Sequence, residues 1–158
     1  MDDNTDQAAI GHLMADRTTA MRTGDAETIC SSYAQDAVIF NLAPPLMQPP
    51  NACRDVRQMK QWFQEKGGRV WAEVREQQIT VSGDLAVCSS LDSLGAPPDA
   101  RQQSSLWYRS TVALARTDGR WLIFHQHTST PFYMDGSMRA ATDLEPDVPG
   151  AAQKSPIK

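Results

Sequence analysis

The most constraining feature of the sequence is a change in the spacing of its apolar residues near residue 69. Before this point they recur every three or four positions, as on one face of an α-helix, and after it they alternate, as on a strand. Helices therefore come first, and strands follow within 158 residues. A chain of this length forms one hydrophobic core, and helices gathered on one face of an antiparallel sheet make an α+β domain.

Three helices and one strand are expected in the first half of the chain. The helices are predicted at residues 6–22, 25–33 and 51–65, and the strand at residues 37–42. Asp25 and Asn51 are of the residue types that cap helix N-termini, and Gly67 with Gly68 stops the third helix. Prolines between Pro44 and Pro50 end the strand, because proline cannot continue a hydrogen-bonded ladder.

Four further strands are expected at residues 69–81, 85–94, 106–116 and 121–130. The first changes its apolar phase between Val74 and Ile79, which predicts a bulge or a bend. Asp118-Gly119 lies between two alternating segments and predicts a tight hairpin. A strongly bent sheet of this kind would enclose a cone-shaped cavity against the helices. The predicted domain spans residues 1–135, and residues 136–158 are expected to form a flexible tail, being rich in Ala, Pro, Asp and Gly without an apolar period.

Composition excludes several functional classes. The net charge is −4 and no basic run occurs, so nucleic acid is not an expected partner. No apolar run is long enough to span a bilayer, and the acidic N-terminus does not resemble a signal peptide, so a cytoplasmic protein without a membrane partner is expected. The three separated cysteines suggest neither a disulfide framework nor a zinc site. No cofactor and no metal are expected.

Several short motifs together resemble a known family. They are Gly24-Asp25, Tyr33-Ala-Gln-Asp-Ala37, Arg109-Ser-Thr111, Asp118-Gly-Arg-Trp121 and the segment Ile123–Ser129. Over residues 7–132 they resemble the SnoaL-like branch of the nuclear-transport-factor-2-like superfamily, which includes ketosteroid isomerases. The last strand is also similar to the association domain of calcium/calmodulin-dependent protein kinase II. The resemblance implies a cystatin-like cone with three N-terminal helices, and a homodimer formed through the outer face of the sheet.

The resemblance does not imply one reaction, because this scaffold hosts isomerases, cyclases, dehydratases, epoxide hydrolases and non-catalytic association domains. Ketosteroid isomerases of this fold use an aspartate base, a tyrosine and a protonated acid. The matching positions here carry Asn41, Arg17 and Thr111. An amide is not a base, and a guanidinium is not a neutral proton donor. Isomerisation by the usual steroid mechanism is therefore not expected.

Arg17 lies on the otherwise apolar stripe of the first helix. It either reaches the rim or pairs with Glu73, or it faces the cavity and binds an anionic or carbonyl-bearing ligand. A two-residue turn at Asp118-Gly119 would pair Thr111 with Gln126, which gives a polar face that includes Arg109. A bulge near the end of the last strand would exchange its faces locally.

Histidines and tryptophans each allow more than one interpretation. His125 and His127 either hydrogen-bond within the sheet, line a dimer interface or hold a metal with other ligands, or His127 acts as an acid or base in the pocket. Trp62 and Trp71 either belong to the core or wall an apolar pocket. No phosphate-binding loop or nucleophile elbow occurs in the sequence.

The leading hypothesis is a homodimeric pocket protein that binds a small organic ligand without a cofactor. It acts as an isomerase, cyclase or lyase on an apolar carbonyl or carboxylate compound, and whether it is an enzyme at all is left open. The predicted catalytic residue is His127, and the predicted ligand-binding residues are Arg17, Asn41, Trp62, Trp71, Arg109, Thr111 and Gln126. The alternative is a non-catalytic association module that uses the outer face of the sheet.

Overall fold

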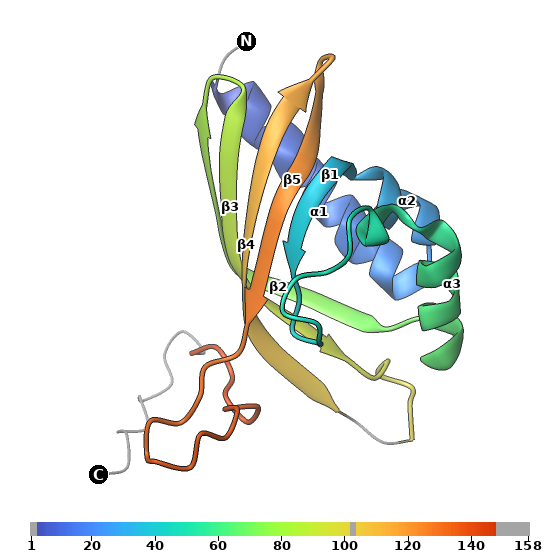
Figure 1. Cartoon of the computed structure of the whole chain (residues 1–158), viewed down its shortest axis with the longest axis vertical. Helices are drawn as coiled ribbons and strands as arrows, with labels where there is room; N and C mark the ends of the chain where they lie inside the picture. Colours follow the sequence, from blue (N-terminus) through green and yellow to red (C-terminus); the bar gives the residue numbers. More distant parts are fainter. Residues whose placement is uncertain (1–2, 102–103, 148–158) are drawn as a thin grey trace.

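The structure is a computed structural model that describes residues 3–101 and 104–147 (Figure 1). Its helices are α1 (Asp3–Thr23), α2 (Ala26–Ser31), the 3-10 helix η1 (Ala52–Arg54) and α3 (Val56–Glu65). Its strands are β1 (Tyr33–Phe40), β2 (Trp71–Ser82), β3 (Leu85–Gly95), β4 (Ser105–Thr117) and β5 (Arg120–Ser129). The order of elements is the one that the change in apolar spacing predicts.

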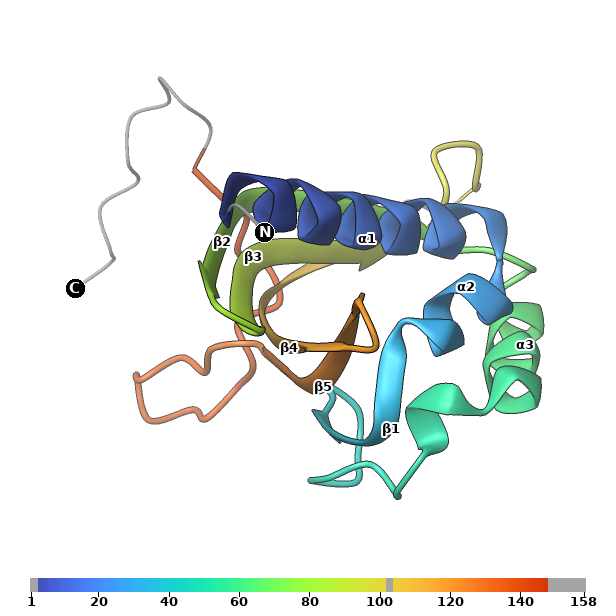
Figure 2. The same cartoon turned by 90° about the horizontal axis from the view of Figure 1, so that it is seen from above.

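The five strands form one curved sheet with the order β1-β5-β4-β3-β2. Figure 2 shows the strands curling into a trough and α1 crossing its concave side beside β2 and β3. Strands β2 to β5 pair in antiparallel fashion, but β1 is parallel to β5, so the expected all-antiparallel sheet is corrected to a mixed one. Parallel pairing needs a long connection, and α3 with strands β2 to β4 supplies it.

The helix boundaries differ from the predicted ones at two places. Asp25 caps α2 as predicted, its Oδ1 accepting from the Thr28 N–H at 3.0 Å. The helix ends at Ser31, because Ser32 O accepts from Ile123 N at 2.9 Å and draws the chain into the sheet. The third helix is capped by Asp55 rather than by Asn51, whose left-handed backbone (φ 62°) instead opens η1.

Within the described residues the strands carry three register shifts, and one of them lies in β1 between Tyr33 and Val38. The predicted bulge in β2 is confirmed by a register shift between Arg75 and Gln78. The predicted hairpin at Asp118-Gly119 is also confirmed, with both residues at positive φ. The third register shift lies in β5, where Ala113 pairs with His125 but Leu114 pairs with Ile123, so that Phe124 is an extra residue without a partner position.

The hydrophobic core extends from α1 and the sheet to α2 and α3, since Ile10, Ile29, Phe63 and Ile123 belong to one cluster of buried residues. Its fully buried side chains include Ile10, Val112, Leu114 and Ile123. Hydrogen bonds join α1 to the β4–β5 hairpin. The buried Asp6 carboxylate accepts from Trp121 Nε1 at 3.2 Å and from Arg116 Nη1 at 2.6 Å. No helix within the described residues is long and apolar enough to cross a bilayer.

The predicted domain boundary at residue 135 and the flexible tail stay predictions. Beyond β5, Phe132 pairs with Ala140, and Ala141 is buried. The rest of the predicted tail, residues 148–158, lies outside the described residues.

Candidate functional site

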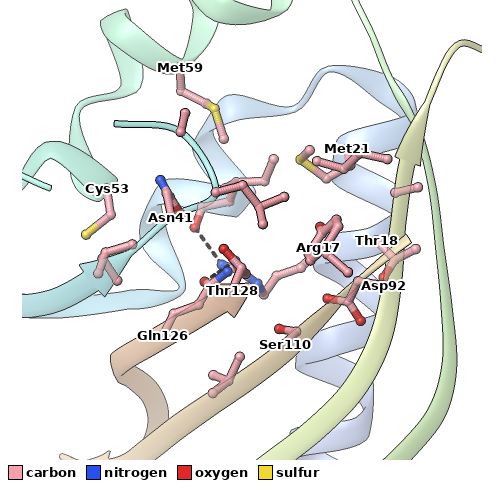
Figure 3. Close-up of a pocket in the computed structure, with 18 of the residues that line it drawn as sticks. Arg17, Thr18, Met21, Asn41, Cys53, Met59, Asp92, Ser110, Gln126 and Thr128 are labelled. Atoms are coloured by element: carbon pink, nitrogen blue, oxygen red, sulfur yellow. Dashed lines mark hydrogen bonds between the residues drawn. The ribbon is translucent and has the colours of Figure 1, made fainter. Parts of the chain in front are cut away.

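A cavity of about 460 Å³ lies between the helices and the sheet, and the core residues Met14, Ile29 and Val112 form part of its lining. This volume is within the usual range for small-molecule sites. Its apolar wall includes Met14, Met21, Ile29, Met59 and Trp62, and its polar wall includes Arg17, Asp92, Tyr108, Ser110, Gln126 and Thr128. Asn41 and Gln48 line it from the loop that follows β1. Figure 3 shows the polar side chains converging from α1 and from the sheet.

Arg17 reaches into the cavity and is held there by four acceptors. Its Nη1 donates to the Ser32 hydroxyl and to the Ile29 carbonyl at 3.3 Å. Its Nη2 donates to Tyr33 Oη at 2.8 Å and to Gln126 Oε1 at 3.4 Å. The Tyr33 hydroxyl in turn donates to Gln126 Oε1 at 2.6 Å. Glu73, the alternative partner for Arg17, instead pairs with Arg75 at 2.8 Å.

Asp92 lies on β3 directly opposite Tyr108 on β4, and both side chains line the cavity. Burial raises the pKa of the Asp92 carboxyl, while the hydroxyls of Ser90 and Ser110 and the charge of Arg17 lower it by less. Ser90 donates to Asp92 Oδ1 at 2.5 Å. The Ser110 hydroxyl is close enough to act on this carboxyl, but its oxygen makes no hydrogen bond of normal geometry with the described residues.

Tyr108 is kept in its neutral, proton-bearing form. Burial raises its pKa above the ordinary value for a tyrosine, and the nearby Asp92 carboxyl raises it further. The wall between β3 and β4 thus pairs an acid of raised pKa with a phenol that stays protonated. The carboxyl group can take up or release a proton, and the phenol can donate a hydrogen bond to a bound compound.

Four of the predicted ligand-binding residues line the cavity, namely Arg17, Asn41, Trp62 and Gln126. Trp71 is not among the lining residues. The residue is 37% exposed, and the centroid of its ring lies 4.4 Å from the Arg22 guanidinium carbon. The structure therefore brings Trp62, but not Trp71, to the apolar wall.

The predicted placement of Arg109 and Thr111 on the cavity face is wrong. Both are exposed on the outer face of β4, and their neighbours Ser110 and Val112 point inward. The extra residue Phe124 shifts the pairing by one, so that Thr111 lies opposite His127 and Gln126 lies opposite Val112. A single face containing Arg109, Thr111 and Gln126 does not exist for this reason.

The two histidines of β5 lie on the outer face with Arg109 and Thr111. His127 is exposed and its ring centroid lies 5.7 Å from that of Phe40, and His125 Nδ1 is 2.9 Å from the Val38 carbonyl oxygen. Neither lines the cavity. Across residues 3–101 and 104–147, no group of three or more His, Cys, Asp or Glu side chains is arranged to hold a metal ion.

Sequence reasoning missed Asp92, Tyr108 and Tyr33. A usable signal existed for Asp92, because extending the alternation of the apolar residues Ala86 and Cys88 by two steps leads to it. Tyr33 gave no such signal, because it was assigned to the end of a helix and it opens β1 instead.

Comparison with known families identifies the family to which this chain belongs. Residues 10–133 match the model of the SnoaL-like domain, which is most of the chain. The chain belongs to the SnoaL-like family. The predicted cystatin-like fold of this SnoaL-like domain is confirmed by solved structures that share it. A search of curated proteins finds no significant match.

Solved structures similar to this SnoaL-like domain have diverse descriptions. An NTF2-like protein of unknown function from Pseudomonas putida is 27% identical, with a TM-score of 0.78, over 90% of this chain and 98% of its own. A proposed dehydratase of the NTF2-like family from Streptomyces avermitilis is 16% identical, with a TM-score of 0.68, over 81% and 97%. The association domain of C. elegans CaMKII is 15% identical, with a TM-score of 0.62, over 81% and 98%. The last two show the fold alone.

The raised pKa of Asp92 predicts a specific pH dependence of stability. The folded state holds this proton more tightly than the unfolded state, so Asp92 favours folding at acidic pH and loses that contribution as pH rises through its folded pKa. Asp92→Asn should therefore be more stable than the parent near pH 8, and the difference should vanish toward pH 4. Urea unfolding at a series of pH values measures this difference in the free energy of unfolding. Asp118→Asn makes the same replacement in the exposed hairpin turn and is the control.

Proposed function

We propose that this SnoaL-like domain binds a compact, mainly apolar carbonyl compound and moves a proton on it without a cofactor, as isomerases, cyclases and lyases do. One observation carries the proposal: an acidic side chain of raised pKa, Asp92, lies on the wall of a cavity of ligand size. Buried carboxyl groups of this kind serve as general acids and bases near neutral pH.

In the proposed step the Asp92 carboxylate takes a proton from the carbon next to the ligand carbonyl. The electron pair of the broken C–H bond moves to the carbonyl oxygen and gives an enolate. In a β,γ-unsaturated ketone this enolate is conjugated with the C=C bond, so the proton can return to the γ-carbon, which shifts the double bond and completes an isomerisation. No oxidant or reductant is required. Hydrogen-bond donors that face the developing oxyanion would lower the barrier, because they need no reorganisation as charge develops. His127, the sequence-based candidate for this role, lies on the opposite face of the sheet.

Binding is tested first, by a thermal-shift screen with cyclic ketones and small carboxylates. A ligand that binds only the folded state raises the melting temperature. Proton transfer is tested next by incubating a ketone that binds in D₂O and following loss of its α-proton signals by ¹H NMR. We expect exchange above the buffer rate, reduced by about 100-fold in Asp92→Asn. Arg109→Ala, on the outer face, should exchange at the parent rate. Equal exchange by Asp92→Asn and the parent would rule out this role for Asp92.

A second candidate function is self-association through the outer face of the sheet. This face exposes Val38, Val87 and Phe124, each more than 40% accessible, and solved structures of this fold include an association domain. Light scattering gives the mass in solution. A homodimer that is unchanged in Asp92→Asn, together with no thermal shift from any compound, would favour this function over the first.

A further inference from the structure

The hydrogen-bond inventory around Arg17 indicates which ligand groups the cavity can accept. A guanidinium has five N–H groups, two on each terminal nitrogen and one on Nε, and it accepts no hydrogen bond. In this structure Nη1 already donates to Ile29 and Ser32, and Nη2 to Tyr33 and Gln126. Only Nε–H has no acceptor among the described residues. Arg17 therefore cannot present the two-pronged edge that binds a carboxylate.

The same contacts fix the orientation of the Gln126 amide. Arg17 and the Tyr33 hydroxyl both donate to one end of it, and because Arg17 can only donate, that end must be the oxygen. The amide nitrogen, Nε2, therefore points away from Arg17. No described residue accepts a hydrogen bond from this nitrogen, and Gln126 lines the cavity. Its two N–H groups are thus available to a ligand.

We infer that Gln126 Nε2 is the group that binds the ligand oxygen, that Arg17 and Tyr33 act as positioning residues that hold it, and that the ligand is an uncharged carbonyl compound rather than a carboxylate. This inference rests on the function proposed above and specifies its substrate class. One neutral amide matches a carbonyl oxygen, and the positive charge of Arg17 behind it favours negative charge that develops there. A carboxylate would lose its hydration and gain at most one charged donor, the Nε–H of Arg17, in place of the two-pronged edge that compensates for it.

The arrangement of the cavity supports the same conclusion. Along the inner face of the sheet, Gln126 and Asp92 lie on different strands, separated by the inward positions of β4, which carry Tyr108, Ser110 and Val112. Figure 3 shows Gln126 on one side of the cavity and Asp92 on the other, with Ser110 between them. A carbonyl group held at Gln126 can therefore extend its carbon skeleton toward Asp92. A carboxylate would also bring a negative charge near the Asp92 carboxyl, whose ionised form burial already disfavours.

The test compares acetophenone with benzoate, two probes of similar shape that differ in charge at the oxygen-bearing group. Dissociation constants measured by calorimetry at pH 8 should favour acetophenone by about tenfold in the parent protein. Gln126→Leu should weaken acetophenone by about tenfold and remove the preference. Arg17→Lys keeps the charge but releases the amide, and it should also reduce the preference. The ratio of the two constants is the decisive readout, because a variant that merely loosens the fold weakens both probes alike.

The outcomes separate this inference from the function on which it rests. Benzoate binding as tightly as acetophenone, or a preference that persists in Gln126→Leu, would overturn the inference while a ligand cavity remains. Failure of both probes and of the whole thermal-shift screen to bind would remove the proposed function itself. Arg109→Ala, which changes an exposed arginine outside the cavity, serves as the control and should bind both probes as the parent does.

Discussion

Replacing Gly24 by alanine is expected to lower the free energy of unfolding by about 3 kcal/mol. The alanine would have to adopt a left-handed backbone conformation, and its Cβ would clash with a neighbouring atom. Gly24 has φ 74°, and a Cβ built on it would lie 2.2 Å from the carbonyl oxygen of Gly68. This contact joins the turn between α1 and α2 to the segment that leaves α3. The loss should therefore come with a displacement of the helices that wall the cavity, and urea unfolding measures its size.

Gly67→Ala is the matched control for this substitution. Gly67 has a similar φ of 82°, but an added Cβ would meet no atom within 4 Å. Only the cost of the left-handed backbone conformation remains, so we expect the free energy of unfolding to fall by about 1 kcal/mol. Equal losses at the two positions would contradict the close approach between Gly24 and Gly68.

Asp6→Ala is expected to cost about 2 kcal/mol, because it leaves the indole N–H of the buried Trp121 without an acceptor. Asp6 also accepts from Arg116, so its carboxylate joins the start of α1 to β4 and β5 near their hairpin turn. Chemical unfolding at neutral pH measures the effect.

Two companion variants show which contact of Asp6 matters. Asp6→Asn keeps an oxygen for Trp121 while it removes the charge, so it should recover part of the stability lost in Asp6→Ala. Asp84→Ala removes the exposed partner of Arg116, and it should change stability little because exposed ion pairs contribute little. A loss in Asp84→Ala as large as that in Asp6→Ala would contradict the role given to the indole contact.

Much of the fold could be predicted because local signals agreed with the final structure. The change from helical to alternating spacing gave the order of elements, and Asp118-Gly119 gave the last hairpin. The β2 bulge was also visible, since Val74 and Ile79 are out of phase in a strand whose other face is polar. The boundary between α2 and β1 was missed because no residue type there opposes continuation of the helix, and a contact with β5 sets it.

The site was only partly predictable, for a reason that lies in β5. Leu122, Ile123 and Phe124 are all apolar, so alternation gives no sign that one of them is extra. Arg109 and Thr111 were consequently assigned to the wrong face. Arg17 was recognised as unusual, but its four acceptors come from α2, β1 and β5, and no local pattern shows that these segments meet.

The extra residue Phe124 also determines which polar side chains of β5 line the cavity. With Ile123 facing inward, uninterrupted alternation would turn the imidazoles of His125 and His127 toward the interior and the amide of Gln126 outward. The one extra residue reverses the direction in which these three side chains point. The same short peptide therefore carries two alternative sets of inward-facing polar side chains, one with an amide and one with a pair of imidazoles, and a scaffold of this kind can exchange them by moving a bulge along the strand without replacing a side chain.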